Sequence, residues 1–304
     1  MHCLQASDGW KLQHMTHRSA SVSRTLRMIC ALLIYIATPG RVQAGPTAAA
    51  VTDFNSYVRA VESGLAQQHE SRSAFLAPVA RVQQSDTLLR RGEIIIEQRT
   101  PSGGLILPGA LLHHWRATAF VPAATAADFT TLLKNVDAYP TDFSPQVLQA
   151  RVLKRDGDHL QAWLRVRQHH VITVVMDTTY DVTFGQLDAE HGYSISRSTR
   201  ISELDSNGRA VDAGQDHGFL WRQNTYWSYE ERDGGLYIQV ESVSLSRSVP
   251  LGLGWAVGPF IESVPRESLE FTLRSACTAL HKMIDRAVKD QHDKQPEETE
   301  RTQG

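Results

Sequence analysis

The sequence predicts an α+β fold in which a curved antiparallel sheet closes over one long C-terminal helix. Three observations predict it. A strand candidate at 112–121 is followed by short helical segments and then by six more strand candidates. Two of the junctions between strands are Asp-Gly pairs, which are typical of tight hairpins. The chain ends in an amphipathic stripe, which is the long element available to cover the apolar face of the sheet.

Residues 1–44 have the pattern of a secretory signal. Arg24 and Arg27 precede an apolar stretch at 28–37, and Val42-Gln43-Ala44 resembles a small-residue cleavage site. This stretch is too short to span a bilayer, which needs about 20 residues. We therefore expect an exported protein, periplasmic or secreted, that begins near residue 45. The alternatives are an uncleaved anchor and a chance apolar run.

Charge and cysteine content fit this expectation. The whole chain has 31 basic and 33 acidic side chains, and residues 1–44 hold five of the basic ones and one acid, so 26 and 32 remain. A mildly acidic chain without a basic stripe argues against a nucleic-acid partner. Cys277 is the one cysteine after residue 44, so the exported protein has no internal disulfide. We expect Cys277 to be a small core residue.

Residues 45–109 are predicted to form an N-terminal extension. After a small-residue linker at 45–51, Asp53 is expected to cap an amphipathic helix over 53–68. Its apolar positions recur at helical spacing and are Phe54, Tyr57, Val58, Val61 and Leu65. A short strand at 93–98 and a loop at 101–108, rich in Gly and Pro, complete the extension.

The central part of the chain alternates in the manner of strands. After the strand at 112–121, Thr125 is expected to cap a helix through Asn135, and a turn or short helix follows at 139–145. The six further strands are predicted at 147–154, 160–168, 171–184, 193–203, 219–231 and 236–246. Asp156-Gly157 joins the first pair and Asp233-Gly234 the last, because Asp-Gly supplies the positive φ angles of hairpin turns.

The last part of the chain is predicted to be a connector, a helix and a tail. Gly252, Gly254 and Gly258 are spaced one residue too widely for a dinucleotide motif and lack a βαβ context, so we expect a bend there. Pro265 is expected to open a helix to about residue 288, because proline is favourable in the first helical turn. Residues 289–304 are polar and are predicted to be disordered.

This order of elements resembles the helix-grip fold of the START-like (SRPBCC) superfamily, which includes polyketide cyclase-like, coenzyme Q-binding-like and plant-allergen-like proteins. The resemblance covers about residues 110–288, and its best carriers are 113–143, 226–247 and 266–285. It implies a cavity for a lipid, isoprenoid, polyketide or other apolar molecule, and it implies no universal catalytic motif. The helix at 53–68 is an addition that covers the domain, plugs its cavity or packs elsewhere.

Alternation suggests which side chains line such a cavity. In 219–229 every second residue is bulky or polar, namely Phe219, Trp221, Gln223, Thr225, Trp227 and Tyr229, and Ser242 lies on the matching face of 236–246. We expect these residues to point inward and to form an aromatic wall with a few hydroxyls. The alternative is that the aromatic side chains simply fill the core.

The strand at 193–203 offers a second candidate face. Tyr193, Ile195, Arg197 and Thr199 share it, and if it is inward then Arg197 needs a partner. That partner is Asp177, Glu241 or the anionic head of a ligand. The predicted ligand-binding residues are Trp221, Trp227, Tyr193, Arg197, Thr199, Asp177 and Ser242.

Other motifs are weaker. Neither His113-His114 nor His169-His170 can chelate as a pair, because adjacent strand residues point to opposite faces, and no HExxH or Cys-containing set exists. We therefore expect no metal and no cofactor. Glu230, Glu231 and Asp233 lie around a hairpin turn, where carboxylates are usually solvated. The sequence contains no Gly-x-Ser-x-Gly elbow and no P-loop.

The sequence therefore favours an exported binding or carrier protein for a hydrophobic or amphipathic small molecule or lipid, with only transient membrane contact and no nucleic-acid partner. One alternative is a cyclase or aromatase-type enzyme in which Tyr193, Asp177 or Arg197 moves a proton. The other is a structural or protein-interaction module that binds no ligand. A non-enzyme is favoured because no catalytic motif is present.

Overall fold

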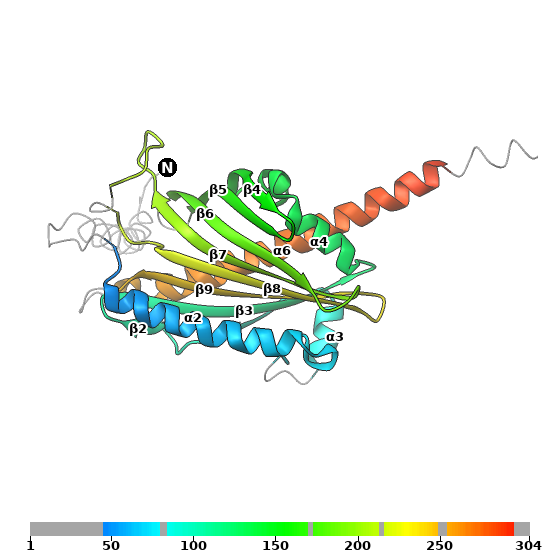
Figure 1. Cartoon of the computed structure of the whole chain (residues 1–304), viewed down its shortest axis with the longest axis horizontal. Helices are drawn as coiled ribbons and strands as arrows, with labels where there is room; N and C mark the ends of the chain where they lie inside the picture. The colour runs from blue at the N-terminus through cyan, green and yellow to red at the C-terminus, as the bar shows by residue number, and fades with distance from the viewer. Residues whose placement is uncertain (1–44, 80–83, 170–172, 213–215, 249–253, 295–304) are drawn as a thin grey trace, which may run out of the picture. The chain divides into compact units, whose positions relative to one another are not determined.

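A computed structural model describes residues 45–79, 84–169, 173–212, 216–248 and 254–294 (Figure 1). The predicted signal at 1–44 and the end of the predicted tail, 295–304, lie outside these residues. No helix in these ranges is both long and apolar enough to cross a membrane.

The core element is a nine-stranded antiparallel sheet in which β1-β3-β9-β8-β7-β6-β5-β4 are neighbours and β2 also pairs with β3. The strands are β1 Ile95–Gln98, β2 Leu105–Leu107, β3 Ala110–Pro122, β4 Val147–Asp156, β5 His159–His169, β6 Thr173–Gln186, β7 His191–Glu203, β8 Arg222–Arg232 and β9 Gly235–Arg247. The predicted strand run is confirmed, but β2 lies in a segment that we expected to be a loop.

Short helices carry the chain across the sheet from β3 to the edge strand β4. They are α4 Ala126–Lys134, the 3₁₀ turn η2 Val136–Ala138 and α5 Tyr139–Asp142. Thr125 caps α4 as predicted, and Asp128 completes a capping box with it. Both Asp-Gly turns are confirmed, with positive φ at Gly157, Asp233 and Gly234.

The long helix α6, Gly254–Lys294, covers one face of the sheet, which we call the inner face (Figure 1). Its predicted apolar stripe packs there with residues of β3, β8, β9 and α4. This inner core includes Leu269, Leu273, Ala276, Leu280, Val121, Trp227, Ile238, Val240 and Phe129. The sheet and α6 therefore share one hydrophobic core, as the sequence predicts.

Both predicted ends of this helix are wrong. It continues to Lys294, so residues 289–294, which we expected to be disordered, are helical. It begins at Gly254, so the segment expected to form a bend is helical from there onward, and Pro265 lies inside the helix. Proline lowers helix stability at an interior position because it lacks an N–H and crowds the preceding turn. Such a local preference is only a weak prior, and tertiary context overrides it.

The N-terminal helix α2, Ala48–His69, covers the opposite, outer face of the sheet (Figure 1). It begins earlier than predicted because Thr47, and not Asp53, caps it, accepting a hydrogen bond from the Ala50 amide. A second core joins the two elements and includes Phe54, Val58, Leu65, Leu112, Trp221, Tyr226, Val243 and Leu245. The 3₁₀ turn η1 Arg72–Ala74 and α3 Ser85–Arg90 follow α2. The added helix thus covers the domain and does not plug it.

Candidate ligand cavity

A cavity of about 180 Å³ lies between the inner face of the sheet, the α4–α5 segment and α6. Because side chains alternate along a strand, every second residue of β5 points into it. Its apolar lining includes Leu133, Val136, Phe143, Leu160, Ala162, Leu164, Val166, Val182, Phe184, Trp227 and Phe271. A cavity of about 150 Å³ is known to hold benzene, so this one has room for a ring-sized group.

The polar part of the lining carries no charge. Its side chains are hydroxyls and amides: Gln146, Gln168, Ser194, Ser196, Gln223, Thr225, Ser268 and Thr272. No Asp, Glu, Lys, Arg or His occurs among the described residues that line the cavity. An ionised ligand group would lose its hydration here without gaining a counter-charge, so the cavity favours neutral groups.

Two tyrosines are the only titratable groups in this described lining. Burial raises the pKa of Tyr180 to about 12 and also raises the pKa of Tyr139. The Tyr139 hydroxyl donates a hydrogen bond to the Leu133 carbonyl oxygen at 2.7 Å. Both phenols are therefore neutral near pH 7, and neither is poised to act as a base.

The prediction for strand β8 is correct in part. Thr225, Trp227 and Gln223 point into the cavity, and Ser242 lies opposite Thr225 on the same face. Trp221 was expected there too, but it lies in the outer core. The strand begins only at Arg222, so alternation does not extend to Trp221, whose ring packs beside Arg247 at 5.8 Å.

The predicted inward face of β7 is wrong. Tyr193 stacks on His69 of α2, with ring centroids 4.3 Å apart, and Arg197 forms a two-point ion pair with Glu62 of α2 at 2.7 and 2.9 Å. The inward residues of this strand are Ser194 and Ser196. Alternation showed which residues share a face, but the face that α2 covers is decided by tertiary packing.

Two more candidates lie away from the cavity. Asp177 is paired with Arg165 of the neighbouring strand, with Oδ1–Nε at 2.7 Å and Oδ2–Nη2 at 2.9 Å. Thr199 is exposed at a bulge between β6 and β7, and its hydroxyl donates to the Thr179 carbonyl. With Arg197 bound to Glu62, the sequence-based case for an anionic ligand head has no geometric support.

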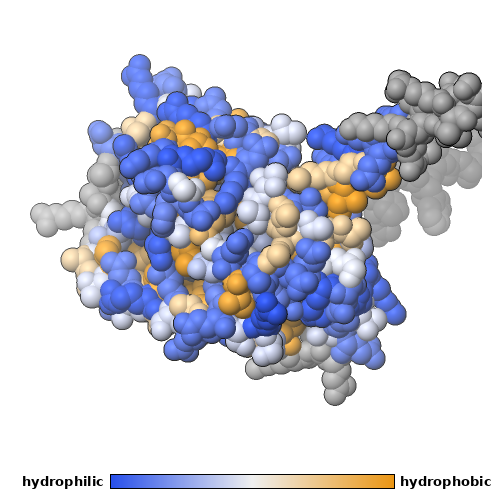
Figure 2. Space-filling model, turned by 45° about the vertical axis from the view of Figure 1, so that its right-hand side comes forward, coloured by the Kyte–Doolittle hydropathy of each residue, from blue (hydrophilic) through white to orange (hydrophobic). Residues whose placement is uncertain are grey.

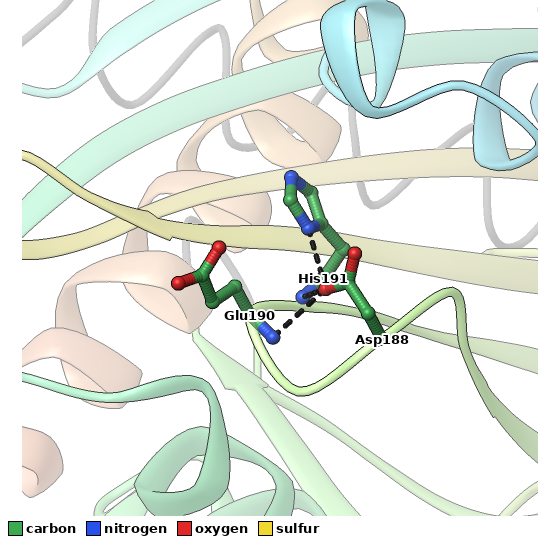
Figure 3. Close-up of side chains that lie close together, drawn as sticks. All are labelled: Asp188, Glu190 and His191. Carbon is green, nitrogen blue, oxygen red and sulfur yellow. Dashed lines mark hydrogen bonds and ion pairs between the residues drawn. The ribbon is translucent and has the colours of Figure 1, made fainter.

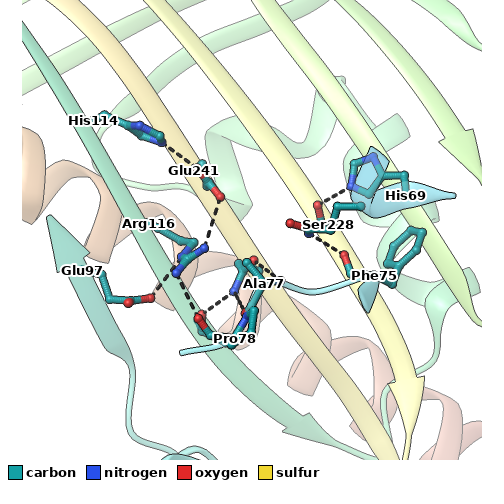
Figure 4. Close-up of polar contacts among 12 residues, drawn as sticks. His69, Phe75, Ala77, Pro78, Glu97, His114, Arg116, Ser228 and Glu241 are labelled. Atoms are coloured by element: carbon teal, nitrogen blue, oxygen red, sulfur yellow. Dashed lines mark hydrogen bonds and ion pairs between the residues drawn. The ribbon is translucent and has the colours of Figure 1, made fainter. Parts of the chain in front are cut away.

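Buried charges lie instead on the outer face, a feature that we did not predict (Figure 4). His114 Nε2 lies 2.6 Å from Glu241 Oε2, and Tyr57 Oη lies 3.0 Å from His114 Nδ1. Arg116 Nε donates to Glu97 at 3.0 Å, and its Nη1 lies 3.8 Å from Glu241 Oε1. Burial raises the pKa of Glu241, but the His114 hydrogen bond and the Arg116 charge outweigh this and hold the pKa below its usual value.

The same network fastens the segment after α2 (Figure 4). The Gln239 amide both donates to and accepts from the backbone of Ala77, at 3.0 Å each, and Arg116 donates to the Pro78 carbonyl at 3.1 Å. His69 Nε2 lies 2.7 Å from Ser228 Oγ. The outer-face network therefore holds the N-terminal extension on the sheet. Glu241, once a candidate partner of Arg197, belongs to it.

One group of side chains has the composition of a metal site (Figure 3). Ligand atoms of Asp188, Glu190 and His191 lie within 4.8 Å of one another. However, Asp188 Oδ1 accepts hydrogen bonds from the amides of Glu190 and His191 and from His191 Nδ1, and Arg72 Nε lies 2.7 Å from Oδ2. The His191 hydrogen bond lowers the pKa of Asp188 to about 2. This geometry is that of a capped β-turn whose carboxylate already has a cationic partner.

Cys277 is an unreactive thiol, and the described residues on the surface shown in Figure 2 form no large apolar patch. Burial raises the pKa of the Cys277 thiol to about 12, which suits the inert role expected of it. On the face shown in Figure 2, hydrophobic side chains form small, separate areas among hydrophilic ones. The large exposed hydrophobic residues are scattered along the chain: Ile106, Leu153, Leu187, Phe219 and Val288.

No protein-family model matches the sequence, and no curated protein matches it. Solved structures do resemble it. Human STARD10 has a TM-score of 0.44 at 8% identity, and the match covers 73% of this chain and 89% of the STARD10 chain. A STAR-related lipid transfer protein from Xanthomonas axonopodis has a TM-score of 0.39 at 15% identity, covering 64% and 98%. The Zhui aromatase/cyclase from a Streptomyces species has a TM-score of 0.40 at 14% identity, covering 57% and 96%.

The order of elements in the structure identifies the fold. A strand, short crossing helices, six antiparallel strands and a long final helix follow one another, and the sheet packs around that helix. This chain therefore has a helix-grip α+β fold, in which a curved antiparallel sheet packs around a long C-terminal helix.

Proposed function

We propose that this chain is an exported protein that binds or carries a hydrophobic or amphipathic small molecule, or part of a lipid, in its internal cavity. The uncharged cavity between the sheet and α6 carries the proposal. Its wall is mostly apolar, with hydroxyls and amides at intervals, which is the usual composition of a small-molecule site. The signal pattern at 1–44 supports export.

Binding is favoured over catalysis by the chemistry of the wall. A cyclase would need a group that moves a proton at the substrate, whereas the described lining offers only two neutral tyrosines. Among the structures of similar fold, one is named for lipid transfer and another for aromatase/cyclase activity, so the fold is compatible with either role.

The test is to express the full chain with residues 1–44 in place and to recover it from the medium and the periplasm. Intact mass shows whether the leader is removed, and native mass spectrometry with organic extraction shows whether an apolar molecule is bound. We expect a shortened chain with an extractable ligand. A chain that keeps residues 1–44 and stays in the cytoplasm would contradict export. A purified protein that holds no ligand and has no affinity for apolar probes would contradict binding.

A filling variant ties binding to this cavity. Ala162 lines it and is almost fully buried, so Ala162→Phe is expected to occupy the volume and abolish ligand retention. Leu153→Phe on the exposed surface of β4 is the matched control and should leave retention unchanged. Equal retention in both variants would place the ligand elsewhere.

A further inference from the structure

Four polar side chains cross the inner face of the sheet in one line, and we propose that they bind an uncharged hydrogen-bonding group of the ligand. This polar row consists of Ser196, Thr225, Ser242 and Trp115. The group it recognises is a hydroxyl or carbonyl, so the ligand class is a neutral alcohol, phenol, ketone or ester. The inference rests on the proposed binding function and adds the chemistry of the ligand.

Strand register makes the row continuous. Ser196 of β7 lies opposite Thr225 of β8, Thr225 lies opposite Ser242 of β9, and Ser242 lies opposite Trp115 of β3. Directly opposed residues of antiparallel strands project from the same face with Cβ atoms about 5 Å apart. Ser196 and Thr225 line the cavity itself, and Trp115 belongs to the inner core. Hydrogen-bonding groups thus extend from the cavity wall along the sheet.

The row has unused hydrogen-bonding capacity. Trp115 is 7% exposed, and its Nε1 is a buried donor without a partner in the described part of the chain. Within the same described ranges, no side-chain hydrogen bond is formed by Ser196, Thr225 or Ser242. The three hydroxyl residues are half-buried, whereas the Trp115 donor is buried. A buried polar group without a partner destabilises a protein, so a ligand group that bonds to Trp115 gains affinity. Hydroxyls donate and accept, and therefore suit either an alcohol or a carbonyl.

The absence of charge narrows the ligand class. Arg197, which the sequence suggested as a partner for an anionic ligand, forms an ion pair with Glu62 on the opposite face of the sheet. Arg165 forms an ion pair with Asp177. Neutral hydroxyls cannot offset the desolvation of a carboxylate or phosphate. The row is therefore suited to a neutral polar group, and the apolar wall near Leu160, Val182 and Phe184 is suited to the rest of the ligand.

Three probes of matched shape test this assignment on the purified exported protein. They are 2-methylnaphthalene, 2-naphthol and 2-naphthoate, which differ in having no polar group, a neutral hydroxyl or an anion. Equilibrium dialysis near pH 7 is expected to show 2-naphthol binding about tenfold more tightly than 2-methylnaphthalene, the gain of one good hydrogen bond. We expect 2-naphthoate to bind most weakly.

Paired variants locate the polar group. Thr225→Val and Ser196→Ala should reduce the preference for 2-naphthol and leave 2-methylnaphthalene binding unchanged. Thr278→Val is the matched control, because this exposed hydroxyl of α6 does not line the cavity and donates to the Arg274 carbonyl at 2.9 Å. This control should leave the preference for 2-naphthol intact. Thermal melting verifies that each variant is folded.

The outcomes separate this inference from the proposed function. Equal binding of all three probes, or preference for 2-naphthoate, would overturn the polar row while leaving a binding cavity. Equal effects of Thr225→Val and Thr278→Val would also overturn it. Failure of every probe to bind the wild-type protein would contradict the binding function itself and, with it, the row.

Discussion

The two faces of the sheet bury polar side chains in opposite ways. On the outer face, Arg197 is paired with Glu62, and His114 and Arg116 share Glu241. On the inner face, the hydroxyls of the polar row form no side-chain hydrogen bond within the described residues, and two of them, Ser196 and Thr225, line the cavity. Paired groups in a filled layer hold structure together, whereas unpaired groups beside a cavity are available to a ligand.

The outer face contributes mainly to stability, and the inner face mainly to binding. The outer-face network joins the N-terminal extension to the sheet, so its removal should lower stability without altering the cavity. Changes at the cavity wall should alter binding first. The four predictions below test the stability side of this division, from the largest expected effect to the smallest.

Glu241→Ala should lower the free energy of unfolding by about 3–5 kcal/mol, because it leaves His114 and Arg116 buried without their shared carboxylate. Urea denaturation measures the loss. Glu190→Ala, which removes an exposed carboxylate, is the control and should change stability by less than about 0.5 kcal/mol. Comparable losses in the two variants would show that the network does not fasten the extension.

Acid should lower the free energy of unfolding through protonation of His69. Burial lowers the pKa of His69 from 6.5 to about 4 in the folded protein, so the unfolded chain binds the proton more readily. The His69 contribution is therefore fully present above pH 6.5 and is lost as pH falls from there to about 4, a loss on the order of 3 kcal/mol. Urea midpoints across this range measure it.

His69→Gln is the matched variant for the pH experiment. Its amide can still bond to Ser228 but does not titrate, so its stability should fall less steeply between pH 6.5 and 4. Identical slopes in wild type and variant would exclude His69 as the group responsible.

Gly192→Ala should destabilise the inner face by about 1–3 kcal/mol, because overpacking forces buried groups to move. A Cβ atom at this position would lie 2.5 Å from atoms of the Tyr229 ring, which is itself fully buried. Thermal melting measures the effect. A variant as stable as wild type would show that Tyr229 moves aside at little cost.

Gly64→Ala should have the smallest effect, with the opposite sign. Gly64 lies in α2, and a Cβ atom there would meet nothing within 4 Å. Alanine favours a helix over glycine by about 0.5–1 kcal/mol, so the variant should be slightly more stable. A loss in thermal melting would mean that α2 packs more tightly at this point than its open surroundings indicate.

Local patterns predicted most of the fold because they depend on neighbouring residues. The Thr125 cap, the Asp233-Gly234 turn and the apolar stripe of α6 were all read correctly. The start of α6 was not, since a proline signal is weak against tertiary packing. The site was predicted only in part. Trp227 and Ser242 have the expected orientation, whereas Tyr193, Arg197 and Trp221 face α2 or its core.

By itself, the sequence determined the strands, the hairpin turns, the amphipathic helices and the sets of residues that share a face. Only the tertiary structure decided which face became the cavity wall and which became the layer beneath α2. The physical reason is that alternation shows which residues share a face of the sheet but does not show which face is the inner one. Strand β3 is buried on both sides along nearly its whole length, so its pattern gives no inner side until the two helices are placed.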